Sequence, residues 1–335
     1  MTTASNFLPP RGWTADQLLD SVRPRGEDWR NVYIVSGLER GLAFYGQQVR
    51  ALRTIAALAE AAGGELAGQR LAVVGAGAAG CTAALAACYA GADEVVLFVR
   101  GHRPLHTHAL ATRWLHPHID RWPSASSRQS WAGLPLLDWR TDRARAVVAQ
   151  LRAQLHHERL RIRSIADDDR KGEVRDVQGH GDRVAVVLAA GGTESFDAAI
   201  VALDTDGGPL RDPSSRCADR PIYWDQGWLD WLRGECVMVS GSGDEELVDL
   251  ARVCMNGFRY ETVVDMLDPS METTQMTELL ALAGRAETSL HHGHALIDYE
   301  LKARVQQLCE GRTNQVYFNC PDGEHLSAPA APLHR

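Results

Sequence analysis

The sequence predicts an α/β protein whose main domain has three layers around a mostly parallel sheet. Three observations predict it: apolar runs of strand length, helical periodicity between them, and a glycine-rich turn after one of the runs. The chain has 335 residues, of which 45% are hydrophobic and 23% charged, so it can bury a sizeable core. We expect three parts, residues 1–65, 66–255 and 256–335.

The first part, residues 1–65, is expected to be an irregular arm followed by a long helix. A short helix is predicted from Thr14 to Val22, within a stretch rich in proline, arginine and tryptophan. Residues 32–38 are expected to lead into one amphipathic helix, because apolar residues recur at helical spacing from Leu42 to Leu58. Gly63 and Gly64 end this helix, since glycine adopts the left-handed conformation that helix ends require.

A glycine-rich turn between a strand and a helix is the strongest functional signal. The apolar strand Leu71–Val74 precedes the six residues GAGAAG, and an alanine-rich helix and a second strand, Glu94–Val99, follow. In such a turn the first glycine permits the tight bend, the second lets the backbone approach a pyrophosphate, and the third lets helix and strand pack closely. The pattern predicts a dinucleotide site formed by Gly75, Gly77, Ala78, Ala79 and Gly80.

The residue that usually binds the adenosine ribose is missing from this pattern. An acidic side chain is expected about 20 residues after the glycines, at the end of the second strand. Phe98, Val99 and Arg100 stand there instead. Either other groups hold the ribose, or Arg100, together with Arg103, accepts the 2′-phosphate of NADP.

The rest of the middle part is expected to alternate loops and short strands. Residues 101–140 show no periodicity and hold several tryptophans and histidines, which predicts a functional loop region. A helix is predicted from Thr141 to His156, and short strands separated by Asp- and Gly-rich turns predict a β-meander from Leu160 to Phe196. The further expected elements are an apolar strand at 198–203, a strand at 236–240, a helix at 245–254 and a mostly helical stretch at 260–309.

This order of parts resembles the FAD/NAD(P)-binding flavoprotein oxidoreductases of the glutathione-reductase type, over roughly residues 70–255. The resemblance implies a Rossmann-like FAD-binding domain in which the last strand, ending at Gly243-Asp244, brings Asp244 to the ribityl chain or pyrophosphate region of FAD. Here Ala202-Leu203-Asp204 replaces the Ala-Thr-Gly with which an apolar strand of the family ends. The polar residues of the first long helix that we expect to face the cofactor are Arg40, Tyr45, Gln47, Gln48 and Arg50.

Two histidines in the loop region are the predicted catalytic residues. His116 and His118 lie in the sequence WLHPHIDRWP, directly after the second strand and its turn. In related flavoproteins this segment folds over the cofactor, so the resemblance implies that the pair lines the flavin or substrate pocket and acts as acid or base. Because no Cys, Asp or Glu shares a ligand spacing with the histidines, we expect no metal.

The predicted activity is oxidation or reduction of a small organic substrate with FAD at one nucleotide site. With one glycine fingerprint, an external reductant or electron acceptor must dock transiently. Two alternatives are an NADP-dependent oxidoreductase without flavin, and a catalytically inactive relative that senses a nucleotide or binds a partner subunit. The C-terminal sequence leaves a homo-oligomer or partner subunit open.

Composition excludes other classes of protein. A net charge of -8 argues against general nucleic-acid binding, and the apolar runs are too short to span a membrane. The N-terminus lacks the pattern of a secretory signal, and the seven cysteines form no CxxC pair. We therefore expect reduced thiols and a cytoplasmic location.

Overall fold

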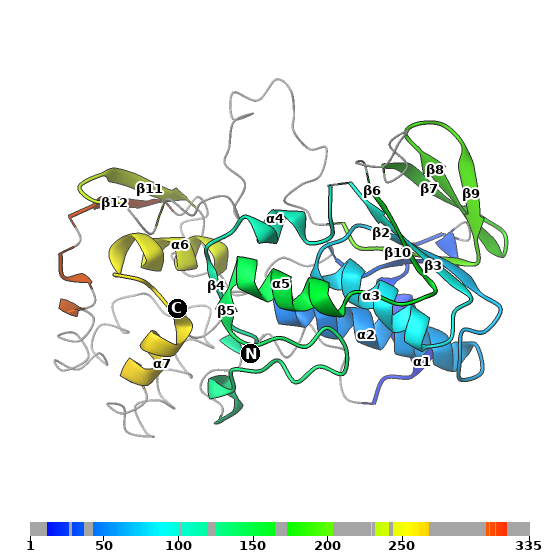
Figure 1. Cartoon of the computed structure of the whole chain (residues 1–335), viewed down its shortest axis with the longest axis horizontal. Helices are drawn as coiled ribbons and strands as arrows, with labels where there is room; N and C mark the ends of the chain where they lie inside the picture. Colours follow the sequence, from blue (N-terminus) through cyan, green and yellow to red (C-terminus); the bar gives the residue numbers. More distant parts are fainter. Residues whose placement is uncertain are drawn as a thin grey trace. The chain divides into compact units, whose positions relative to one another are not determined.

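The computed structural model describes residues 12–26, 29–36, 43–100, 102–119, 125–164, 173–203, 229, 232–240, 244–267, 306–307, 309–311 and 313–319 (Figure 1). The chain forms two compact units: one comprises residues 8–115 and 131–225, and the other comprises 1–7, 116–130 and 226–335. The predicted domain bounds, 1–65, 66–255 and 256–335, stay a prediction, because the units interleave along the chain.

A five-stranded parallel sheet forms the centre of the larger unit. Its order is β1-β10-β2-β3-β6, and each neighbouring pair is parallel. The strands are β1 (Val32–Ile34), β10 (Ala198–Val201), β2 (Arg70–Val74), β3 (Glu94–Val99) and β6 (Leu160–Ser164). Strands buried on both faces read as continuous apolar runs, which is why β2, β3 and β10 are visible in the sequence.

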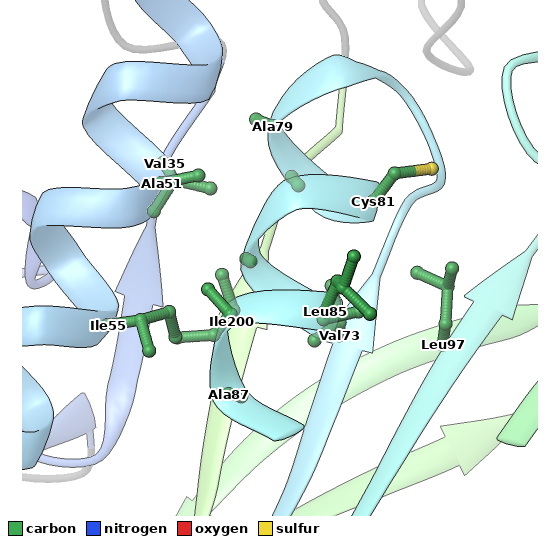
Figure 2. Close-up of a cluster of buried hydrophobic side chains, with 14 of the residues drawn as sticks. Val35, Ala51, Ile55, Val73, Ala79, Cys81, Leu85, Ala87, Leu97 and Ile200 are labelled. Carbon is green, nitrogen blue, oxygen red and sulfur yellow. The ribbon is translucent and has the colours of Figure 1, made fainter. Parts of the chain in front are cut away.

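Helices cover one face of this sheet. They are α1 (Ala15–Val22), α2 (Phe44–Ala61), α3 (Ala78–Tyr89) and α5 (Ala144–Gln154), which share one apolar core with alternate residues of the strands. In Figure 2, Leu85 of α3 lies beside Val73 of β2, and Ile55 lies on the neighbouring helix α2. Since α3 is built mainly of alanine and other small residues, it packs closely on the sheet and on α2.

A three-stranded antiparallel meander covers the other face. Its strands are β7 (Val174–His180), β8 (Arg183–Leu188) and β9 (Thr193–Phe196). Phe196 packs edge-on against Phe98 of β3, and Val184 and Val186 share this second core with Val74. The predicted three-layer Rossmann-like fold with a β-meander is therefore confirmed.

Two segments differ from the sequence prediction. Val32–Ile34, expected to lead into the long helix, is an edge strand whose Val32 pairs with Ala199. Leu160–Ser164, expected within the meander, is the opposite edge strand and pairs with β3. Both strands gain parallel hydrogen bonds from neighbours that are distant in the sequence, which local periodicity cannot reveal.

The larger unit also contains α4 (His106–Ala109) and a short antiparallel pair, β4 (Trp114–Leu115) with β5 (Asp142–Arg143). The smaller unit contains a 3-10 turn (Ala125–Arg128), the helices α6 (Asp244–Cys254) and α7 (Tyr260–Leu267), and the parallel pair β11 (Cys236–Ser240) and β12 (Gln315–Asn319). The predicted strand at 236–240 thus pairs with β12 and not with the five-stranded sheet.

None of the helices in the described part of the chain has the length and apolar character needed to cross a bilayer.

Candidate functional site

The glycine turn lies at the carboxyl edge of the five-stranded sheet, between β2 and α3. Gly75 has φ +104, a conformation that L side chains rarely adopt, and its N–H donates to the carbonyl of Phe98 at 3.1 Å. A β-carbon at Gly75 would lie 2.3 Å from the carbonyl oxygen of Ala202, just after β10. The turn therefore lies so close to the end of β10 that a residue with a side chain would not fit at position 75.

Gly80 provides a second close approach. A β-carbon there would lie 1.9 Å from the carbonyl oxygen of Gly75 and 3.2 Å from Cβ of Ala202. The third glycine therefore lets the first turn of α3 pack directly on the turn and on the end of β10, as predicted. Gly77 is the N-cap of α3 and has extended backbone angles.

The amino end of α3 has the charge that a negatively charged ligand requires. The first N–H groups of a helix have no partner within the helix, and the helix dipole gives this end a partial positive charge. Gly77 offers no side-chain cap, and the first turn carries no acidic residue. The N–H groups of Ala78, Ala79 and Gly80 belong to this first turn, and their contact with a phosphate stays a prediction.

Neighbouring segments hold the turn in place. The carbonyl of Ala76 accepts a hydrogen bond from the N–H of Leu105 at 2.8 Å and one from Sγ of Cys81 at 3.3 Å. The guanidinium of Arg152 donates two hydrogen bonds to the carbonyl of Pro104, at 2.6 and 2.8 Å. The loop after β3 and helix α5 therefore fix the position of Ala76.

Cys81 is not an activated thiol. Burial raises the pKa of Cys81 to about 12, although the positive charge of Arg152 opposes the shift. The thiol therefore stays protonated at neutral pH. It packs in the core that the helices share with the sheet, as a small apolar group.

The edge beyond β3 is basic. Arg100 follows directly after this strand and is exposed, and Arg103 is exposed nearby. The strand end itself, Phe98 and Val99, is buried. The structure thus places a guanidinium where related sites have a ribose-binding carboxylate.

Gln48, which we expected to face the cofactor, is instead part of a buried polar network. Its Oε1 accepts a hydrogen bond from the indole N–H of Trp139 at 2.7 Å, and its Nε2 donates to the carbonyl of Leu137 at 3.1 Å. A longer bond of 3.4 Å reaches Oγ1 of Thr82 on α3. This network, which sequence analysis missed, ties α2 and residues 137–139 to the helix that follows the glycine turn.

The two predicted catalytic histidines lie in the smaller unit. Both are buried. The centroid of the His116 ring lies 4.3 Å from the centroid of the ring of Tyr260, which is the first residue of α7. The Tyr260 hydroxyl donates to the carbonyl of His118 at 3.5 Å. The structure therefore brings the pair together with α7, while the glycine turn belongs to the larger unit.

Of the two residues predicted to contact the ribityl region, Gly243 lies outside the described residues, and Asp244 is the first residue of α6. Their cofactor contact stays a prediction. Among the described residues, no group of three or more His, Cys, Asp or Glu side chains is arranged to hold a metal ion.

Comparison with known proteins agrees with this geometry. Residues 70–159 match the model of a family described as FAD dependent oxidoreductase, and this segment runs from β2 through α3 and β3 into α5. The match confirms the predicted relation to flavin-dependent oxidoreductases, with FAD as the cofactor. No match exists among the curated protein sequences.

A solved structure that resembles the chain is the lysine monooxygenase NbtG from Nocardia farcinica, described for an unprecedented conformation of its NADPH domain. The TM-score is 0.24 and the sequence identity 18%, over 44% of this chain. The similar region spans 30% of that protein.

Proposed function

We propose that the chain binds one FAD at the glycine turn and uses it in the oxidation or reduction of a small organic substrate. The observation that carries this proposal is that Gly75 and Gly80 have no room for a β-carbon. They lie next to a helix end that has no side-chain cap and no acidic residue. A turn needed only for packing would not require a helix end that lacks both a side-chain cap and acidic residues.

The main chain would bind the pyrophosphate. The N–H groups of Ala78, Ala79 and Gly80 donate to phosphate oxygens, while Gly75 and Gly77 let the backbone come close. We assign Gly243 and Asp244 to the ribityl region, on the resemblance to flavoproteins. When bound, the flavin supplies two-electron chemistry, and the protein supplies binding, orientation and electrostatics.

A single nucleotide site means that a second redox molecule has to reach the flavin. A second molecule, either a reductant or an electron acceptor, must dock transiently, because the chain has one glycine fingerprint of this kind. The acid or base role predicted for His116 and His118 stays part of the proposal for His118 alone, because the hydrogen bond at Nδ1 of His116 favours a different role for that residue.

Calorimetric titration of the full chain with FAD tests the proposal. We expect one FAD per chain and a large loss of affinity in Gly80→Ala, whose new β-carbon would collide with the carbonyl of Gly75. Gly133→Ala is the control, because Gly133 also belongs to the larger unit but has nothing within 4 Å of its β-carbon position. Equal affinities in the two variants would contradict the assignment of the site.

NADP as the bound nucleotide is the second candidate, and the exposed Arg100 directly after β3 favours it. A guanidinium at this position binds a 2′-phosphate bidentately. Under this alternative NADPH binds more tightly than NADH, and Arg100→Ala removes the difference. Under the FAD proposal, neither nicotinamide nucleotide displaces FAD from the turn.

A further inference from the structure

The hydrogen-bonding pattern of His116 fixes which ring nitrogen carries its proton. The backbone N–H of His118 donates to Nδ1 of His116 at 3.1 Å. An N–H group can only donate, so Nδ1 must be the unprotonated, accepting nitrogen of the ring. In the neutral imidazole the single proton then resides on Nε2.

The surroundings keep the ring neutral. His116 is 7% exposed, and Tyr260, which packs against its ring, is 3% exposed. Burial, together with the neighbouring His118, lowers the pKa of His116 to about 4. At neutral pH the ring is therefore not an imidazolium that can give up a proton, and Nε2, already protonated, cannot accept one.

The Nε2–H group is a buried donor without a hydrogen-bond partner among the described residues. Leaving such a group unsatisfied costs about 1–3 kcal/mol, so most buried donors in native proteins are paired. Hydrogen bonds within the chain do satisfy the other nitrogen of the ring and the hydroxyl of Tyr260. An acceptor from outside the chain would complete the arrangement.

We infer that His116 donates its Nε2 hydrogen to the carbonyl oxygen of a bound organic molecule. An uncharged carbonyl suits the site better than a carboxylate, because a buried carboxylate would need a positively charged partner and the ring is neutral. A neutral donor in a dry site binds a carbonyl and polarises it without transferring a proton. His116 is thus a binding residue, and the acid or base role passes to other groups.

The organic substrate provides this oxygen. The inference goes beyond the proposed function, because the protonation state of His116 does not depend on which nucleotide binds at the glycine turn.

Long-range ¹H–¹⁵N NMR of the full chain, labelled with [¹⁵N]histidine, tests the inference. The His116 signals are identified by their loss in His116→Gln. We expect an unprotonated Nδ1 and a protonated Nε2, unchanged between about pH 6 and 8. A protonated Nδ1, or an imidazolium signal within this range, would overturn the inference.

Titrations with cyclohexanone and cyclohexanecarboxylate then test the acceptor. We expect the Nε2 signal to move with cyclohexanone, and not with the carboxylate of similar size. Signals of His180, an exposed residue of the meander, serve as the control for unspecific effects.

A signal that does not move with the ketone, or a signal that moves with the carboxylate alone, would overturn the assignment. FAD binding is measured separately by visible absorption. Failure of the chain to bind FAD would contradict the proposed function, whereas the state of the His116 ring is read independently of it.

Discussion

Gly75 and Ala202 approach so closely that a β-carbon on the glycine would lie 2.3 Å from the alanine carbonyl oxygen. The two residues follow β2 and β10, which are adjacent parallel strands. Ligands of parallel α/β sheets bind at this carboxyl edge, beside the amino ends of the helices. The close approach thus links the packing of the sheet to the shape of the proposed nucleotide site.

The variant Gly75→Ala should weaken FAD binding at least about tenfold, equivalent to about 1.4 kcal/mol. The new β-carbon would collide with the carbonyl of Ala202, so the turn or the end of β10 must move. This movement would displace the N–H groups at the start of α3. Gly64→Ala is the matched control, because Gly64 has φ +118 but nothing within 4 Å of its β-carbon position. Both variants carry backbone strain, so an equal loss of FAD affinity would show that strain alone is responsible.

The variant Gln48→Leu should destabilise the protein by about 1–3 kcal/mol for each buried polar group left unpaired. The change removes the partners of the Trp139 indole N–H and of the Leu137 carbonyl. Chemical unfolding of the variant measures the loss. The control Gln178→Leu replaces an exposed glutamine of the meander and should shift the free energy of unfolding by less than about 0.5 kcal/mol. Equal shifts would refute the importance of the buried network.

The buried imidazole of His108 should make the free energy of unfolding smaller in acid than at neutral pH. Burial lowers the pKa of His108 to about 4 from its ordinary value of 6.5. Because the unfolded chain binds a proton more readily, the stabilising contribution is fully present above pH 6.5 and is lost as the pH falls through 4.

The variant His108→Phe should therefore lose less stability than the wild type between about pH 7 and 5, by about 1–2 kcal/mol. The phenyl ring can keep the edge-on contact with Phe44 that the imidazole makes at 5.1 Å. Unfolding titrations at both pH values measure the difference. His180→Phe, at an exposed position, should retain the acid sensitivity of the wild type. If His108→Phe retains it as well, the neutral state of buried His108 is not its cause.

Sequence analysis predicted the segment from β2 to β3 well because its signals are local. The strand Arg70–Val74, the glycines and the small residues of α3 all lie within one βαβ unit, and each residue type has a direct structural reason. The strands of the meander are similarly visible, because turn residues separate them.

The features that could not be predicted involve strands and side chains whose partners are distant in the sequence. The strand Leu160–Ser164 alternates arginine with apolar residues, as a meander strand does, and nothing local indicates that it pairs with β3. The strand Cys236–Ser240 is present as predicted, but nothing local indicates that its partner is β12. The bond between Gln48 and Trp139 joins residues 91 positions apart, so only the fold reveals it.

For the candidate site, the sequence pattern identified the glycine turn but not the protonation of His116. The residue types in WLHPHIDRWP suggest an acid or base, since histidine titrates near neutral pH. Only the position of the His118 N–H, and the burial of the ring against Tyr260, show that the neutral ring keeps its proton on Nε2.

The most direct test of the central claim is the visible absorption spectrum of the full-length protein after purification and incubation with FAD, followed by mass analysis of the nucleotide released by heat. We predict a flavin spectrum that stays with the protein through gel filtration, and FAD as the released species, at one equivalent per chain. A colourless protein that binds no added FAD, or one that releases NADP instead, would contradict the assignment of the glycine turn to FAD.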